Sequence, residues 1–125
     1  NSMIDSDPIG LSTWLANSLN DFKLAYLHIM RGDFFQQQKG DILTPMRAAY
    51  HGTLIANMGY TPAEAEQAIA DGKVDAVAFG TGFLANPDFP ARIKLGAALN
   101  QIDPTSFYSP GAAGYTDYPT LAAAL

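Results

Sequence analysis

The hydrophobic pattern of the chain alternates between helical periodicity and short continuous apolar runs. Asp7-Pro8 is typical of a helix cap followed by proline at the first helical position, and the apolar positions after it predict a helix over 8–22. Those positions are Leu11, Trp14, Leu15, Leu19 and Phe22. The run LAYLHIM at 24–30 is short for a globular helix and predicts a strand buried on both faces.

The same alternation continues towards residue 96. A polar tract with glycines predicts a loop over 31–41, and Thr44-Pro45 predicts the cap of a short helix that ends near residue 50. Two further apolar runs predict strands over 53–57 and 74–80. Each of these strands is followed by a stretch with helix signals, over 61–72 and 86–96.

The helix signals are most complete between residues 61 and 72. Thr61 is expected as N-cap, Glu64 closes a capping box with it, and Gly72 ends the helix. In the helix that follows the cap at residues 86–88, Phe89 and Ile93 are expected to point inward.

Helices and strands are thus predicted to alternate, with three strands that each lie between two helices. This order indicates an α/β fold with a parallel sheet. A chain of 125 residues fits one compact domain. We expect a core over 1–96 and a tail rich in glycine, proline and tyrosine over 97–125, with a short helix at 120–125.

Composition narrows the possible partners. The formal net charge is -5 and the seven lysines and arginines are scattered, so nucleic acid and anionic membranes are poor partners. No run approaches the roughly 20 apolar residues that span a bilayer, and the first residues lack the pattern of a signal peptide. We therefore expect a soluble, cytoplasmic protein.

Metal and acid-base chemistry have little support. The chain has no cysteine, and His28 and His51 are not part of a metal-binding spacing. His28 is expected to be a hydrogen-bonded core or strand-end residue, and His51 to cap a helix C-terminus. The aspartates lie in predicted caps and turns, so no metal site and no catalytic carboxylate pair is assigned.

Glycines follow two of the predicted strands, at Met58-Gly59 and at Gly80-Thr81-Gly82. Ligands of parallel α/β folds bind at the carboxyl ends of strands, where glycines and helix N-termini suit a phosphate. One hypothesis is therefore an anion site across both strand ends. The other is that these glycines serve only the geometry of the turns, because GTG alone matches no nucleotide-binding motif.

Three tyrosines gather in the tail, at Tyr108, Tyr115 and Tyr118. They could fold over a ligand as a lid or anchor the tail to the body of the protein. From the residues alone, anchoring is the preferred interpretation.

Two segments have a more specific pattern, AFGTGFLANPDFP at 78–90 and FYSPGAAGYTDYP at 107–119. With LAYLHIM and GTLIANMGYTPAEAEQAIADG, they resemble the old yellow enzyme family, FMN-dependent ene-reductases built on a (β/α)8 TIM barrel. The resemblance covers only the C-terminal part of that family, strands six to eight, whereas a whole barrel needs about 250 residues. It therefore implies a partial barrel.

The resemblance also implies site residues. In the family, the ends of strands seven and eight bind the FMN phosphate, which corresponds here to Met58, Gly59, Gly80 and Thr81. Met58 stands where the family commonly has glycine, and Thr81 where it has an arginine, so FMN binding should be weakened. Tyr108 matches a tail tyrosine near the substrate, which favours the lid over the anchor if the rest of the barrel is present.

The family uses NAD(P)H to reduce FMN and then reduces the C=C bond of α,β-unsaturated carbonyls. The residues that bind the carbonyl and donate the proton belong to parts of the family's chain that are not matched here, so no catalytic residue is assigned and the isolated chain should be inactive. An alternative is a non-enzymatic α/β module that oligomerises. In either case, association with a second copy or with a complementing barrel fragment is expected, because an open parallel sheet is normally covered.

Overall fold

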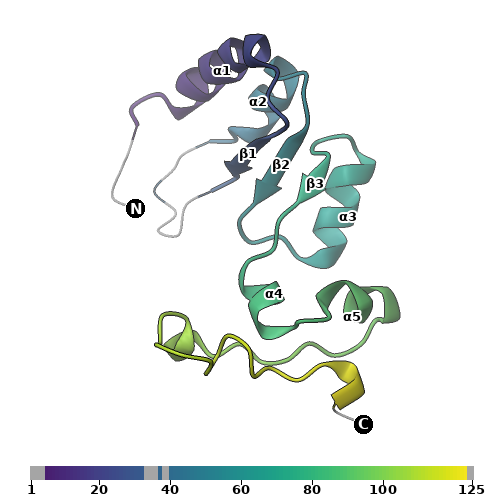
Figure 1. The fold of residues 1–125 in the computed structure, drawn as a ribbon. Helices are drawn as coiled ribbons and strands as arrows, with labels where there is room; N and C mark the ends of the chain where they lie inside the picture. The colour runs from purple at the N-terminus through teal and green to yellow at the C-terminus, as the bar shows by residue number, and fades with distance from the viewer. Residues whose placement is uncertain (1–4, 33–36, 38–39, 124–125) are drawn as a thin grey trace. The chain divides into compact units, whose positions relative to one another are not determined.

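The computed structural model describes residues 5–32, 37 and 40–123 (Figure 1). The elements in chain order are α1 (Pro8–Leu19), the 3-10 helix η1 (Asn20–Phe22), β1 (Leu27–Met30), α2 (Leu43–Ala49), β2 (Leu54–Asn57), α3 (Pro62–Ala70), β3 (Ala76–Val77), α4 (Thr81–Ala85), α5 (Phe89–Leu95), and the 3-10 helices η2 (Pro104–Ser106) and η3 (Leu121–Ala123). The chain divides into two compact units, Asn1–Ala78 and Phe79–Leu125. The three strands lie in the first unit.

The sheet of the first unit has the order β1-β2-β3, and both pairings are parallel. His28 is paired with Ile55 and Met30 with Asn57, while Ile55 also pairs with Ala76. This arrangement confirms the predicted parallel α/β fold.

One face of this sheet is buried against helices. Ile29, Leu54 and Ala56 share that face and are at most 8% exposed, and they pack in one cluster with Ala16 of α1, Met46 of α2 and Ala68 of α3. Side chains alternate across a strand, so the residues between them point to the other face.

The other face of β1 is open, because His28 is exposed and Met30 is 43% exposed. The prediction that this run is buried on both faces is therefore wrong. The helices of the first unit bury one side of the sheet, and the hydrophobic run alone does not reveal which side is left uncovered.

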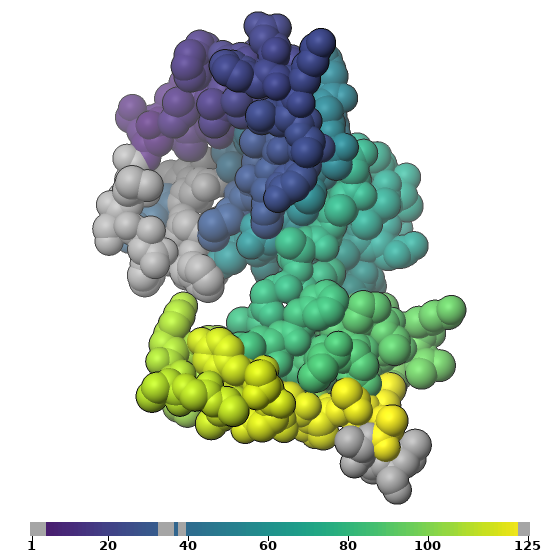
Figure 2. Space-filling model, viewed as in Figure 1, coloured from purple at the N-terminus to yellow at the C-terminus, as the bar shows by residue number. Residues whose placement is uncertain are grey.

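The first helix follows its sequence signals. Asp7 caps it by accepting a hydrogen bond from the N–H of Gly10 at 2.9 Å, and η1 continues the predicted span to Phe22. Its apolar stripe is only partly covered, since Trp14 is 65% and Phe22 69% exposed. Figure 2 shows the α1 segment at the surface of the first unit.

Helices α2 and α3 begin in different ways. Thr61 and Glu64 form the predicted capping box, which stabilises a helix such as α3 by about 1 kcal/mol. The predicted cap of α2 at Thr44 is wrong, because Thr44 lies inside the helix. Instead the carboxylate of Asp41 accepts hydrogen bonds from the N–H groups of Leu43 and Thr44, at 2.9 and 3.2 Å.

The third strand is shorter than the predicted span of 74–80. Hydrogen bonds from the N–H of Asp75 to the carbonyl of Leu54 and from Ala78 to Ala56 extend the pairing slightly beyond β3, each at 2.9 Å. Because β2 itself ends at Asn57, residues after Ala78 find no partner on it. Strand length is thus set by the neighbouring strand rather than by the apolar run.

The second unit is organised around Phe89. This side chain is 2% exposed, as predicted, and its ring makes edge-on contacts with Phe79 and Phe83 at centroid distances of 5.2 and 5.3 Å. Ile93 is 40% exposed, so its predicted inward position is wrong.

Two local features of the second unit differ from expectation. Residues 81–85 form α4, which the sequence reasoning had assigned to a turn. The end of the tail forms η3 at Leu121–Ala123 rather than a helix over 120–125, of which 124–125 lie outside the described residues. In the first unit, much of the predicted loop at 31–41 also lies outside the described residues.

Across residues 5–32, 37 and 40–123, no helix is both long and apolar enough to cross a membrane.

Candidate functional site

The chain turns at Met58 and Gly59 directly after β2. Both residues have positive φ, 88° for Met58 and 67° for Gly59. Glycine adopts this left-handed region freely, whereas a residue with a Cβ costs about 1–2 kcal/mol there. A glycine at position 58, as the resemblance expects, would relieve that strain. With methionine, the turn needs support from its surroundings.

Arg31 provides this support from the neighbouring strand. It follows β1 directly, and its N–H donates to the carbonyl of Asn57 at 3.1 Å. Its guanidinium donates from Nε to the carbonyl of Met58 and from Nη2 to that of Gly59, both at 2.7 Å. The same guanidinium lies 3.6 Å from the centre of the Tyr60 ring. Arg31 thus holds both residues of the turn.

Glu64 connects this arginine to the start of α3. Its carboxylate lies 3.7 Å from Nη2 of Arg31 and accepts a hydrogen bond from the N–H of Thr61 at 2.8 Å. The Thr61 N–H and hydroxyl, and then Arg31, lower the pKa of Glu64 below its usual value. At neutral pH the carboxylate is therefore ionised and takes part in both the capping box and the ion pair.

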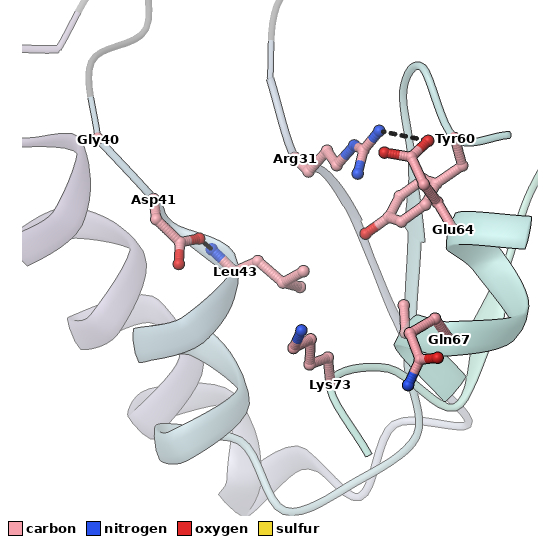
Figure 3. A pocket seen from close by; sticks show the side chains of 9 residues that line it. Arg31, Gly40, Asp41, Leu43, Tyr60, Glu64, Gln67 and Lys73 are labelled. Atoms are coloured by element: carbon pink, nitrogen blue, oxygen red, sulfur yellow. Dashed lines mark hydrogen bonds and ion pairs between the residues drawn. The ribbon is translucent and has the colours of Figure 1, made fainter. Parts of the chain in front are cut away.

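A cavity of about 470 Å³ lies beside Arg31 (Figure 3). Its lining comes from the start of α2, the ends of β1 and β2, and α3: Arg31, Gly40, Asp41, Leu43, Tyr60, Glu64, Gln67, Ala68 and Lys73. The lining contains two basic and two acidic side chains. Such a balanced lining does not select an anion or a cation.

The second glycine turn lies in the second unit. Gly80 is the N-cap of α4, and a Cβ added to it would meet no atom within 4 Å. Gly82 is different, because its added Cβ would lie 3.0 Å from the ring of Phe89. Gly82 therefore allows close packing, while the space over Gly80 is open. Thr81 is exposed and starts α4.

The tail is attached to the second unit by a buried arginine. Arg92 is 3% exposed and donates to Asp88 at 2.7 Å, to the carbonyl of Ala98 at 2.6 Å and to the carbonyl of Pro119 at 2.8 Å. The amide of Asn100 also donates to the carbonyl of Pro119, at 2.8 Å. These hydrogen bonds could not be predicted from the sequence, because the residues that they join lie up to 27 positions apart.

The three tail tyrosines behave differently from one another. The hydroxyl of Tyr115 donates to the carbonyl of Phe107, and that of Tyr118 accepts from the N–H of Asp103 at 3.1 Å. Both therefore fix the tail locally. Tyr108 is 96% exposed. Its side chain is therefore available for a role outside the tail.

The core position expected for His28 and the helix-cap position expected for His51 are not observed, while the alternative of a strand-end His28 agrees with its place as the second residue of β1. His28 lies exposed on the uncovered face of β1 rather than in the core. The C-cap of α2 is Tyr50, and His51 beside it donates its backbone N–H to Oδ1 of Asn20 at 3.0 Å. Among the residues that the structure describes, no three histidines, aspartates or glutamates gather as a metal site would require.

The predicted phosphate-binding residues thus form two pairs of consecutive residues, Met58-Gly59 in the first unit and Gly80-Thr81 in the second. Both turns have features that suit a phosphate. The main-chain N–H groups of Gly59 and Tyr60 donate no hydrogen bond to any other described residue, and the space over Gly80 is open. Thr81 supplies a hydroxyl but no charge. The residues present fit the phosphate of FMN, with one cation fewer than the resemblance implies.

Comparison with known proteins gives consistent results. No protein-family model matches the chain. It is 44% identical over 121 residues to a probable flavin mononucleotide-dependent alkene reductase of Leishmania infantum, a match that covers 97% of this chain and 33% of the relative. It is also 40% identical over 124 residues to 12-oxophytodienoate reductase 2 of Arabidopsis thaliana, covering 94% of this chain and 33% of that protein.

Solved structures agree. The old yellow enzyme from Trypanosoma cruzi matches with a TM-score of 0.92 and 46% identity, over 95% of this chain and 32% of that one. Morphinone reductase matches with a TM-score of 0.83 and 41% identity, over 94% and 32% of the two chains. The chain thus spans about a third of the length of the relatives that it matches.

The similarity extends through both compact units and is high in sequence as well as in fold. Its relatives are FMN-containing oxidoreductases with a TIM barrel, of which this chain covers three parallel strands and five α-helices. The chain is therefore, over almost its whole length, a homologue of the old yellow enzymes.

Proposed function

We propose that this chain is the C-terminal third of an FMN-dependent NAD(P)H oxidoreductase that reduces activated C=C bonds of α,β-unsaturated carbonyls. The observation that carries the proposal is the similarity over 97% of the chain to a relative named as a flavin mononucleotide-dependent alkene reductase. One of the similar structures is morphinone reductase with bound tetrahydroNAD, which supports a nicotinamide reductant. When bound, FMN supplies the redox chemistry of such a reaction.

In this proposal the chain contributes part of the FMN phosphate site. Met58 and Gly59 form the turn after β2, at which the main-chain N–H of Gly59 is available, and Gly80 and Thr81 offer the open turn and a hydroxyl at the start of α4. Each pair acts from its own compact unit. Tyr108, which is 96% exposed, is proposed to contact the substrate.

We further propose that the 125 residues alone do not reduce enones. The chain covers about a third of its relatives, and hydride transfer requires reacting groups to be held in close alignment from several barrel strands. Reduction then depends on the remaining strands, from the same polypeptide or from a complementing fragment.

A second candidate function is a non-enzymatic module that associates with a copy of itself. The uncovered face of β1 and the exposed apolar side chains Trp14 and Phe22 favour it. Apolar surface of this kind, together with an open strand edge, is usually covered by a partner.

Titration of the purified chain with FMN and with riboflavin distinguishes the two candidates. The first predicts that flavin fluorescence changes with FMN at lower concentration than with riboflavin, because only FMN carries the phosphate. It also predicts no NADPH oxidation with 2-cyclohexenone. Equal and negligible responses to both flavins, together with a tight oligomer in sedimentation velocity, would support the second candidate and contradict the first.

A further inference from the structure

Arg31 belongs to none of the residues that the resemblance assigns to FMN binding, yet it makes the closest contacts to the turn at Met58 and Gly59. Its guanidinium donates to the two consecutive carbonyls of that turn, each at 2.7 Å. Hydrogen bonds from a charged donor at this distance are among the stronger ones in proteins. The orientation of two successive peptide groups is therefore fixed by one side chain.

The position of this side chain is itself fixed. Its backbone N–H is bonded to Asn57, the Tyr60 ring lies 3.6 Å from the guanidinium carbon, and Glu64 lies 3.7 Å from Nη2. Figure 3 shows Arg31, Tyr60 and Glu64 gathered on one side of the cavity. A planar guanidinium with an aromatic face on one side and a carboxylate beside it loses little further freedom when it binds the turn.

The consequence for the N–H groups follows from the geometry of the peptide bond. There are no cis peptide bonds in the described residues, and in a trans peptide the N–H points opposite to the C=O. Because the carbonyls of Met58 and Gly59 point to Arg31, the N–H groups of Gly59 and Tyr60 point away from it. Neither of these N–H groups donates to another described residue.

We infer that Arg31 is a positioning residue that turns the N–H groups of Gly59 and Tyr60 towards a phosphate. It holds the strained conformation at Met58, where φ is 88°, and its positive charge lies behind the donors. This inference rests on the proposed function for the identity of the phosphate, that of FMN. It also assigns Tyr60, through its main chain, to the site at this turn, and it places a cation beside the turn.

The test is a comparison of Arg31→Lys with Arg47→Lys in ¹⁵N-labelled protein. Arg47 is the matched control, because its guanidinium also binds two main-chain carbonyls, those of Tyr50 and Gly52, before the start of β2. Lysine keeps the charge but cannot bind two carbonyls with a planar fork. Arg31→Lys should shift the amide signals of Gly59 and Tyr60, because the two peptide groups lose their fixed orientation. Arg47→Lys should leave both at their wild-type values.

Flavin titration of the same proteins adds a readout for the ligand. Arg31→Lys should lower the affinity for FMN about tenfold and leave that for riboflavin unchanged. Unchanged amide signals of Gly59 and Tyr60 in Arg31→Lys would overturn the positioning role, and an equal loss of affinity for both flavins would overturn the phosphate assignment. If wild-type protein binds no FMN, the proposed function fails, while the amide comparison still decides the role of Arg31. Should Arg31→Lys not fold, Arg31→Gln, which retains one donor group, replaces it.

Discussion

At the scale of single residues, charge is distributed unequally between the two glycine turns. Thr81 is exposed and offers a hydroxyl at the start of α4, without a formal charge. Arg31 lies behind the Met58-Gly59 turn and is bonded to its carbonyls. The positive charge therefore lies beside the first turn, and the second turn offers a phosphate only an uncharged hydroxyl.

Restoring a charge at position 81 should strengthen FMN binding. In Thr81→Arg, a charged hydrogen bond to the phosphate should raise the affinity about ten- to hundredfold in a flavin titration. Thr81→Met is the matched control, since it adds a long side chain without charge. Equal affinities of the arginine and methionine variants for FMN would show that no phosphate lies near this turn.

Residues with local partners could be predicted from sequence, whereas those with distant partners could not. Thr61 and Glu64 are three positions apart, and their capping box was predicted correctly. Arg31 binds carbonyls 27 and 28 positions away, so it was placed in a loop without a role. The signal available in the sequence was its position directly after an apolar strand, where side chains of parallel folds point to ligands.

At the scale of elements, the type of each helix or strand was easier to predict than its length or the burial of its faces. The order of strands and helices and the parallel pairing were correct, because short apolar runs separated by capped helices leave few alternatives. The length of β3 was wrong, since it depends on where β2 ends. The exposure of one face of β1 was also not predicted, because an apolar run does not show whether another element covers that face.

The attachment of the tail to α5 should depend on pH through Asp88. Its carboxylate accepts from the N–H of Leu121 at 2.8 Å and pairs with Arg92 at 2.7 Å, and these contacts lower its pKa in the folded protein from 3.8. A lowered pKa contributes stability above the unfolded value, and this stability is lost as the pH falls through the folded value. The Leu121 amide signal should therefore change in acid, below about pH 4.

The comparison for this titration is Asp88→Asn, which cannot lose a charge. In that variant the acid-dependent change of the Leu121 signal should disappear, whereas Asp21→Asn, at an exposed position in η1, should retain it. The same acid transition in Asp88→Asn as in wild type would assign the effect to another carboxylate.

At the scale of the whole molecule, the chain is similar to old yellow enzymes along almost its entire length, which corresponds to about a third of the length of these relatives. The outer face of β1 is uncovered, and large apolar side chains such as Trp14 and Phe22 are exposed. The family could be predicted from the motifs at residues 78–90 and 107–119, and the similarity to known old yellow enzymes over 95% of the chain agrees with that prediction. Partner and oligomeric state could not, because they depend on surfaces outside this chain.

The central claim is that this chain supplies the phosphate-binding third of an FMN-dependent reductase. Its most direct test is a chimera in which the chain replaces the matching third of the old yellow enzyme from Trypanosoma cruzi, measured by the FMN content of the purified, folded protein. The account predicts a yellow protein with FMN bound, and less FMN when Arg31→Lys is introduced. A folded chimera that carries no flavin would contradict it.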